Sequence, residues 1–285
     1  MALGLEKWKV HEQVARGIIH FVGDSKPRIL FGFLMSTGLL SMWISNTATA
    51  LMMLPMALAV IHALPIGEKH SRFPMLLLLS VAYAASVGGM ATLVGSPPNI
   101  QMASILEQNY QIEIDFISWM KVALPISLSM ILAIFLFFYF LLGKERKGEE
   151  QQIAIKPEPW NKDQLLILII FGIVVILWSF REYFNGMGFN YRDEVPAILG
   201  AVLMFLIPSS HKKPILVWKD TEKLPWGILL LFGGGLALAA MFEKNGVITA
   251  MTASFSNFSS LPFFLLLLII VAVAIFATEI MSNLA

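Results

Sequence analysis

Residues 41–49 read SMWISNTAT, a run of hydroxyl and amide side chains inside an otherwise apolar stretch. Two apolar arms flank this run, Ile29 to Ile44 and Ala50 to Ile61, and as helices they would be about 24 and 18 Å long at 1.5 Å per residue. Neither arm comfortably crosses a hydrocarbon core of about 30 Å. The segments outside both arms are basic, and basic segments lie on the cytoplasmic side of a membrane. The pattern predicts a re-entrant helical hairpin, which enters and leaves by one face, with its tip at residues 45–47.

The composition places the chain in a membrane. Of its 285 residues, 57% are hydrophobic and 14% charged, and the mean hydropathy is +0.75, outside the range of soluble domains. Long apolar windows recur, so we expect an all-α polytopic membrane protein embedded in the lipid bilayer. The windows are 117–142, 165–180, 195–207, 224–242 and 261–281. The absence of cysteine excludes disulfides and thiolate sites, and a net charge of +1 without a basic tail argues against nucleic acid as a partner.

The segment 74–107 is interrupted at residues 95–99, which read GSPPN. Glycine weakens the helix that precedes it, and consecutive prolines cannot donate backbone hydrogen bonds but fit the start of a helix. The motif therefore predicts a discontinuous membrane helix with its break at 95–99.

One constant offset aligns polar landmarks of the chain with each other: it places Glu6-Lys7 on Glu243-Lys244 and Ser45-Asn46 on Ser282-Asn283. The basic flanks indicate that the first tip is approached from the cytoplasm and the second from outside. Such an inverted repeat is typical of transporters, whose central site is reached alternately from both faces. Parts of each copy have no counterpart in the chain, so we expect a fragment truncated at both ends, which should not transport alone.

The hairpin tip combines groups suited to ions of both signs. Ser45 and Asn46 supply oxygens for a cation, and the helix predicted to start near Ala48 directs free N–H groups and a positive dipole end toward the tip. Ser41 lies one helical turn before Ser45. Hard cations prefer several oxygens, which hydroxyls, amides and the carbonyls of a broken helix provide.

The second tip repeats this spacing, because Thr278 lies four residues before Ser282. A single serine or threonine in a membrane helix usually bonds to the preceding turn and has no binding role. Two Ser-Asn tips, each with a hydroxyl one turn away, together with a glycine and proline break, favour a binding site.

Glu279 is the only ionisable residue deep in an apolar window, where an unpaired carboxylate is costly. A functional interpretation assigns it cation attraction or proton coupling. A structural interpretation has it tether the second hairpin by pairing with a polar group. Both remain open, and direct contact with an anionic substrate is disfavoured.

Three motifs resemble the signatures of the divalent anion/sodium symporter family, the INDY-like dicarboxylate transporters: SMWISNTATALMMLP around the first tip, GSPPN at the break, and TEIMSN at residues 278–283. The resemblance extends over essentially the whole chain. It implies a homodimer whose transport domain moves against a scaffold in the manner of an elevator. It also implies sodium-coupled import of C4-dicarboxylates such as succinate, with citrate or sulfate in some members.

The resemblance also implies a division into domains and roles for individual residues. Residues 1–28 would form the end of a scaffold helix plus an amphipathic interface helix, 29–107 the transport-domain hairpin and broken helix, 117–260 scaffold helices with a second interface segment, and 261–285 the first arm and tip of the second hairpin. One sodium site would comprise Ser41, Ser45, Asn46 and Gly95, and another Thr278, Met281 through its carbonyl, and Asn283. Substrate would contact Ser45, Asn46, Thr47, Ser282 and Asn283, with Ser96 and Pro97 nearby.

Two positions depart from the family pattern. Leu284 stands where many bacterial relatives have threonine, which removes a hydroxyl from the second tip. Ser96 replaces a common threonine and keeps the hydroxyl.

The leading prediction is a sodium-coupled carrier in a bacterial inner membrane, and other functions remain open. A proton-coupled or exchange-type carrier of citrate or sulfate would use Glu279, and an ion channel is disfavoured by two occluding tips. An enzyme is not expected, because the sequence shows no paired acid and base or metal-binding constellation.

Overall fold

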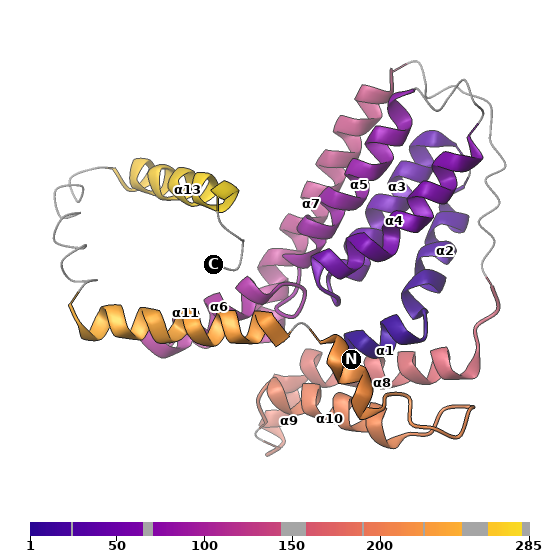
Figure 1. Cartoon of the computed structure of the whole chain (residues 1–285). Helices are drawn as coiled ribbons and strands as arrows, with labels where there is room; N and C mark the ends of the chain where they lie inside the picture. The colour runs from indigo at the N-terminus through magenta and orange to yellow at the C-terminus, as the bar shows by residue number, and fades with distance from the viewer. Residues whose placement is uncertain are drawn as a thin grey trace. The chain divides into compact units, whose positions relative to one another are not determined.

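The computed structural model describes residues 1–23, 25–64, 71–143, 158–189, 191–224, 226–246 and 262–280 (Figure 1). These residues form helices joined by turns and contain no β-strand; a single isolated bridge pairs Pro208 with Pro214. This confirms the predicted all-α class. The chain divides into two compact units, Met1–Glu222 and Lys223–Ala285.

The first unit contains α1 (Ala2–Lys7), α2 (Val10–Val22), α3 (Lys26–Ser41), α4 (Asn46–Ala63), α5 (Arg72–Gly89), α6 (Pro97–Tyr110), α7 (Phe116–Leu142), α8 (Lys162–Ser179), α9 (Arg181–Gly186) and α10 (Glu194–Leu206). A short 3-10 helix, η3 (Trp218–Lys223), follows at the boundary between the units. The second unit contains α11 (Trp226–Lys244) and α13 (Phe263–Ile280).

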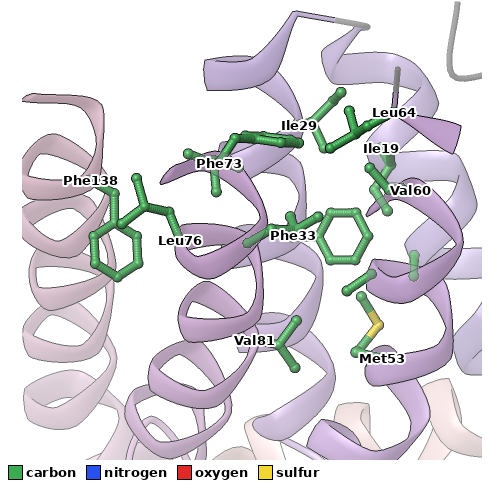
Figure 2. Close-up of a cluster of buried hydrophobic side chains, with 14 of the residues drawn as sticks. Ile19, Ile29, Phe33, Met53, Val60, Leu64, Phe73, Leu76, Val81 and Phe138 are labelled. Atoms are coloured by element: carbon green, nitrogen blue, oxygen red, sulfur yellow. The ribbon is translucent and has the colours of Figure 1, made fainter. Parts of the chain in front are cut away.

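The helices α3, α4, α5 and α7 lie side by side and form the main core (Figure 1). Figure 2 shows Phe33 of α3, Met53 and Val60 of α4, and Leu76 of α5 converging in one apolar cluster, which also includes Phe138 of α7. Both arms of the α3–α4 hairpin pack against α5. The predicted hairpin therefore exists as a packed unit; that it is re-entrant in a membrane remains a prediction.

The non-helical tip of the hairpin lies earlier in the chain than the predicted residues 45–47. Helix α3 ends at Ser41 and α4 already begins at Asn46, so only residues 42–45 are non-helical. Ser45 is the N-cap of α4, and its side chain accepts a hydrogen bond from the Ala48 amide at 3.4 Å. A serine in this position satisfies one of the amides that the first helical turn leaves without a partner. The cap therefore starts α4 earlier than the expected position near Ala48.

The break between α5 and α6 covers residues 90–96, earlier than the predicted interval 95–99. Pro97 and Pro98 form the first turn of α6, where a missing amide proton costs no hydrogen bond and the fixed φ suits the helix. The sequence motif thus marks the start of α6, whereas α5 ends where Gly88 and Gly89 pack against the hairpin.

Helices α3 and α5 touch through their backbones at Gly38 and Gly88. A Cβ atom on Gly88 would lie 2.2 Å from the carbonyl oxygen of Gly38. Small residues at a crossing let two membrane helices approach closely enough for backbone contact. This contact places the C-terminal ends of α3 and α5 beside the hairpin tip.

Three helices among the described residues are long and apolar enough to cross a membrane: Arg72–Gly89, Phe116–Leu142 and Lys162–Ser179. Shorter apolar helices cover 46–62, 194–206 and 263–276. Arg72–Gly89 coincides with the first part of the predicted broken helix at 74–107, and each of the others with a predicted apolar window or hairpin arm. In the second unit, α11 and α13 coincide with the windows at 224–242 and 261–281.

Residues 1–28, predicted to hold the end of one helix and an amphipathic interface helix, contain α1 and α2, which are separated at Lys9, where the backbone is left-handed with φ of 55°. Helix α2 buries Val10, Ala15 and Ile19, whereas Phe21 is 91% exposed. The amphipathic character is present, and its location at a membrane interface remains a prediction.

Helix α8 starts with a capping box. The Gln164 amide donates to Asn161 Oδ1 at 2.8 Å, and the Asn161 amide donates to Gln164 Oε1 at 3.1 Å. Asn161→Ala is expected to destabilise the protein by about 1 kcal/mol, because it leaves an amide of the first turn without a partner. Thermal unfolding in detergent measures this loss. Ser25→Ala is the matched control, since Ser25 is the N-cap of α3 but makes no capping hydrogen bond. Equal melting temperatures for the two variants would contradict the prediction.

Candidate functional site

The predicted residues of the first half-site gather where the hairpin tip meets the break after α5. Ser41 and Gly95 are buried, Ser45 and Asn46 are half-buried, and Thr47 is exposed. The tip therefore offers a buried oxygen-rich side and an accessible side within a few residues of each other.

The Ser41 hydroxyl lies between two oxygens that can only accept hydrogen bonds. Its Oγ is 2.9 Å from Asn46 Oδ1 and 2.6 Å from the carbonyl oxygen of Ala85 on α5. A hydroxyl has one proton and can donate to only one of these oxygens at a time. The cluster thus contains more acceptors than protons, which is the composition that a hard cation prefers.

Backbone carbonyls add to this cluster beside Gly95. A Cβ atom on Gly95 would lie 2.7 Å from the Gly89 oxygen, 2.9 Å from the Ser41 oxygen and 3.0 Å from the Met42 oxygen. The three carbonyls therefore converge on one point, and only glycine leaves room there. Gly89 is similarly constrained, because its Cβ would lie 2.0 Å from Asn46 Oδ1.

Four helix ends meet in this region. The C-terminal ends of α3 and α5 supply the carbonyls of Ser41 and Gly89 and carry partial negative charge. The N-terminal end of α4 supplies backbone donors and partial positive charge. The N-terminal end of α6 has fewer donors, because Pro97 and Pro98 lack amide protons. A cation is therefore favoured beside α3 and α5, and an anion beside α4.

An aromatic cluster supports the non-helical tip. The Trp43 ring packs edge-on against Phe171 of α8 with centroids 4.8 Å apart, and lies 5.9 Å from the ring of Phe116. Phe116 in turn stacks on Trp178 at 4.8 Å. Through Trp43, residues 42–45 are therefore packed against side chains that lie outside the hairpin.

Two residues that the sequence interpretation did not assign contact the same region. Thr92, fully buried, donates from Oγ1 to the Met42 oxygen and accepts from the Gly95 amide at 3.0 Å. Asn99, 8% exposed, donates from Nδ2 to the oxygens of Gly89 and Thr92, both at 2.8 Å. Asn99 could have been found from the sequence, because it belongs to the GSPPN motif. No motif in the sequence marks Thr92.

The structure describes the other predicted site residues only in part. Ser96 and Pro97 are half-buried next to Gly95, at the N-cap and first position of α6. Thr278 and Glu279 lie in the last turn of α13, whose side chains there are not described. Met281, Ser282, Asn283 and Leu284 lie outside the described residues. Among the predicted site residues, those of the first tip and of the GSPPN break are the ones whose side chains the structure describes.

A separate cavity of about 320 Å³ lies between α6 and the ends of α8 and α10. Two ion pairs cross its rim, Arg181 with Glu113 and Arg192 with Glu107, and Arg181 also contacts Asp193 at 3.3 Å. Burial raises the pKa of Asp193, while the Arg181 charge and the Phe116 amide oppose this effect. The cavity is not lined by the tip residues, and its arginines already have carboxylate partners.

A family model described as citrate transporter matches residues 1–285, the whole chain. The chain belongs to the citrate transporter family. Members of a transporter family with several apolar helices are integral membrane proteins, and so is this chain. The family assignment agrees with the resemblance drawn from the three motifs.

Among its relatives is the sodium-dependent dicarboxylate transporter SdcS of Staphylococcus saprophyticus, 33% identical over all of this chain and 59% of that protein. The SdcS protein of Staphylococcus aureus strain USA300 is 31% identical, again over all of this chain and 59% of its own length. The chain thus spans about three fifths of the length of these relatives.

Proposed function

We propose that this chain contributes the first half of a site that couples sodium to the transport of a C4-dicarboxylate such as succinate. The observation that carries this proposal is the convergence of the Ser41, Met42 and Gly89 carbonyls beside Gly95, next to the Ser41 and Asn46 side chains. The relatives named as sodium-dependent dicarboxylate transporters support the choice of both ions.

The two ions would occupy different sides of the tip. Sodium would bind Ser41, Ser45, Asn46 and Gly95, where two helix C-termini supply negative potential. A substrate carboxylate would contact Ser45, Asn46 and Thr47 at the N-terminal end of α4. Asn46 belongs to both the sodium set and the substrate set, since its side-chain oxygen faces Ser41 and it is the first residue of α4. Binding of one ion therefore orders a residue that the other requires, which is a physical basis for coupling.

The second half of the site would come from the second hairpin. Thr278, Met281 and Asn283 would hold another sodium ion, and Ser282 and Asn283 would contact the substrate, with Ser96 and Pro97 close to it. The two Ser-Asn tips are predicted to be approached from opposite sides of the membrane, which supports alternating access around a central site. We further propose the elevator arrangement, the four-part domain division and the homodimer that the resemblance implies, in a bacterial plasma membrane.

Uptake measurements test this function directly. The complete protein that contains these residues is reconstituted in liposomes, and radiolabelled succinate uptake is followed under an inward sodium gradient. Accumulation above the external concentration is expected with sodium, and only slow equilibration with an equal potassium gradient, because the proposed coupling ion is sodium.

Three outcomes favour the alternatives. Accumulation driven by an inward proton gradient without sodium indicates proton coupling, for which Glu279 is the candidate. Accumulation that requires internal dicarboxylate indicates exchange. Uptake that never saturates with succinate concentration indicates a channel and contradicts a carrier.

A further inference from the structure

The hairpin tip and the turn after α5 are fifty residues apart in sequence, and Thr92 joins them through one hydroxyl. Its Oγ1 donates to the Met42 oxygen in the tip and accepts from the Gly95 amide in the turn. A hydroxyl has one proton and can also accept, so both bonds are satisfied at once. The side chain is fully buried, which keeps water from competing for either bond.

Asn99 closes the same turn from the other side. Its two amide protons go to the oxygens of Gly89 and Thr92, both at 2.8 Å. Gly89 is the last residue of α5 and Thr92 lies within the turn, while Asn99 belongs to the first turn of α6. Asn99 thus ties the end of α5 to the start of α6 across the non-helical segment.

Both side chains act on the atoms that surround Gly95. Thr92 holds the Met42 oxygen and the Gly95 amide, and Asn99 holds the Gly89 oxygen. The Met42 and Gly89 oxygens are two of the three carbonyl oxygens that converge beside Gly95. The Gly95 amide is held as well. The Thr92 bond to Met42 therefore joins the tip to the turn, and the two Asn99 bonds hold the turn itself against the end of α5.

We propose that Thr92 and Asn99 are positioning residues that set the affinity of the first sodium site, Thr92 by fixing the turn after α5 to the hairpin tip and Asn99 by fixing the shape of that turn. This inference rests on the proposed function. Neither residue is assigned direct contact with sodium or substrate. Because the substrate side of the tip is built by the start of α4, their loss should affect sodium affinity more than substrate affinity.

Thr92→Val is the sharpest test, because it keeps the shape of the side chain and removes only the hydroxyl. In the complete protein containing this chain, the sodium concentration for half-maximal succinate uptake is expected to rise about tenfold, the equivalent of one lost buried hydrogen bond. The KM for succinate at saturating sodium is expected to change by less than about twofold. Thr92→Ser, which restores the hydroxyl, is expected to recover most of the sodium affinity.

Asn99→Asp provides an independent variant, since it keeps the size but directs an oxygen at two carbonyls in place of two protons. It should also raise the sodium concentration for half-maximal succinate uptake. Thr37→Val is the matched control: Thr37 is a fully buried threonine on α3 whose hydroxyl has no hydrogen-bond partner among the described residues. Its sodium requirement should equal that of the wild type.

A sodium-dependent rise in melting temperature, measured on purified protein without substrate, separates the possible failures. A wild-type protein that shows no such rise contradicts the proposed function and this inference with it. A normal wild-type rise that Thr92→Val and Asn99→Asp retain at the same sodium concentrations contradicts the inference alone. Equal losses in sodium affinity and succinate affinity would indicate a general structural role and would also overturn it.

Discussion

Asn46→Ala is expected to reduce sodium-driven succinate uptake by about 100-fold, the largest functional effect predicted for a single side chain here. The variant removes the oxygen that lies 2.9 Å from Ser41 Oγ and the side chain that opens α4. Both the cation and the anion lose a partner, so the two losses should combine. Initial uptake rates in liposomes, at several sodium concentrations, measure the effect.

Asn46→Asp separates the two roles of this residue. It keeps an oxygen beside Ser41 and adds a negative charge, which favours a cation and repels a carboxylate. We expect sodium-dependent thermal stabilisation to persist while the KM for succinate rises. Asn245→Ala, the same chemical change as Asn46→Ala at an exposed position after α11, should leave uptake unchanged. Wild-type uptake by Asn46→Ala would remove Asn46 from the proposed site.

Gly88→Ala is expected to cause the largest loss of stability. The added Cβ would lie 2.2 Å from the oxygen, 2.7 Å from the Cα and 2.8 Å from the carbonyl carbon of Gly38. These are backbone atoms, so no side chain can rotate away and α3 must move from α5. Overpacking of this kind costs about 3 kcal/mol or more. A reduced yield of monodisperse protein and a fall in melting temperature on the order of 10 °C are expected.

Gly172→Ala is the control for this substitution. Gly172 lies in the middle of α8, and a Cβ there would meet no atom within 4 Å. Alanine is favoured over glycine in a helix interior, so the melting temperature should remain the same or rise slightly. If both variants unfold at the wild-type temperature, the close contact between α3 and α5 does not contribute to stability.

The sequence determined the elements of the fold through local chemistry. The lengths of the apolar windows predicted the membrane helices, since the bilayer imposes a length on any segment that crosses it. The prolines at 97 and 98 predicted the start of α6, because a missing amide proton acts within one helical turn, whereas α4 starts at Asn46, before the expected position near Ala48, because Ser45 caps it. The ends of the helices were less well predicted: the break begins at residue 90 because Gly88 and Gly89 meet the hairpin there, a contact between distant segments.

The candidate site divides in the same way. Ser41, Ser45 and Asn46 could be identified from the sequence, because residues one helical turn apart share a face and their polarity stands out among apolar neighbours. The partners of these residues could not. Ala85, Gly89 and Thr92 reach the tip only because α3 and α5 cross at two glycines, and Asn99 only because the chain turns back after α5. Hydrogen bonds between segments tens of residues apart depend on how helices cross. Only the tertiary structure decides that crossing, because many crossings satisfy the same apolar pattern.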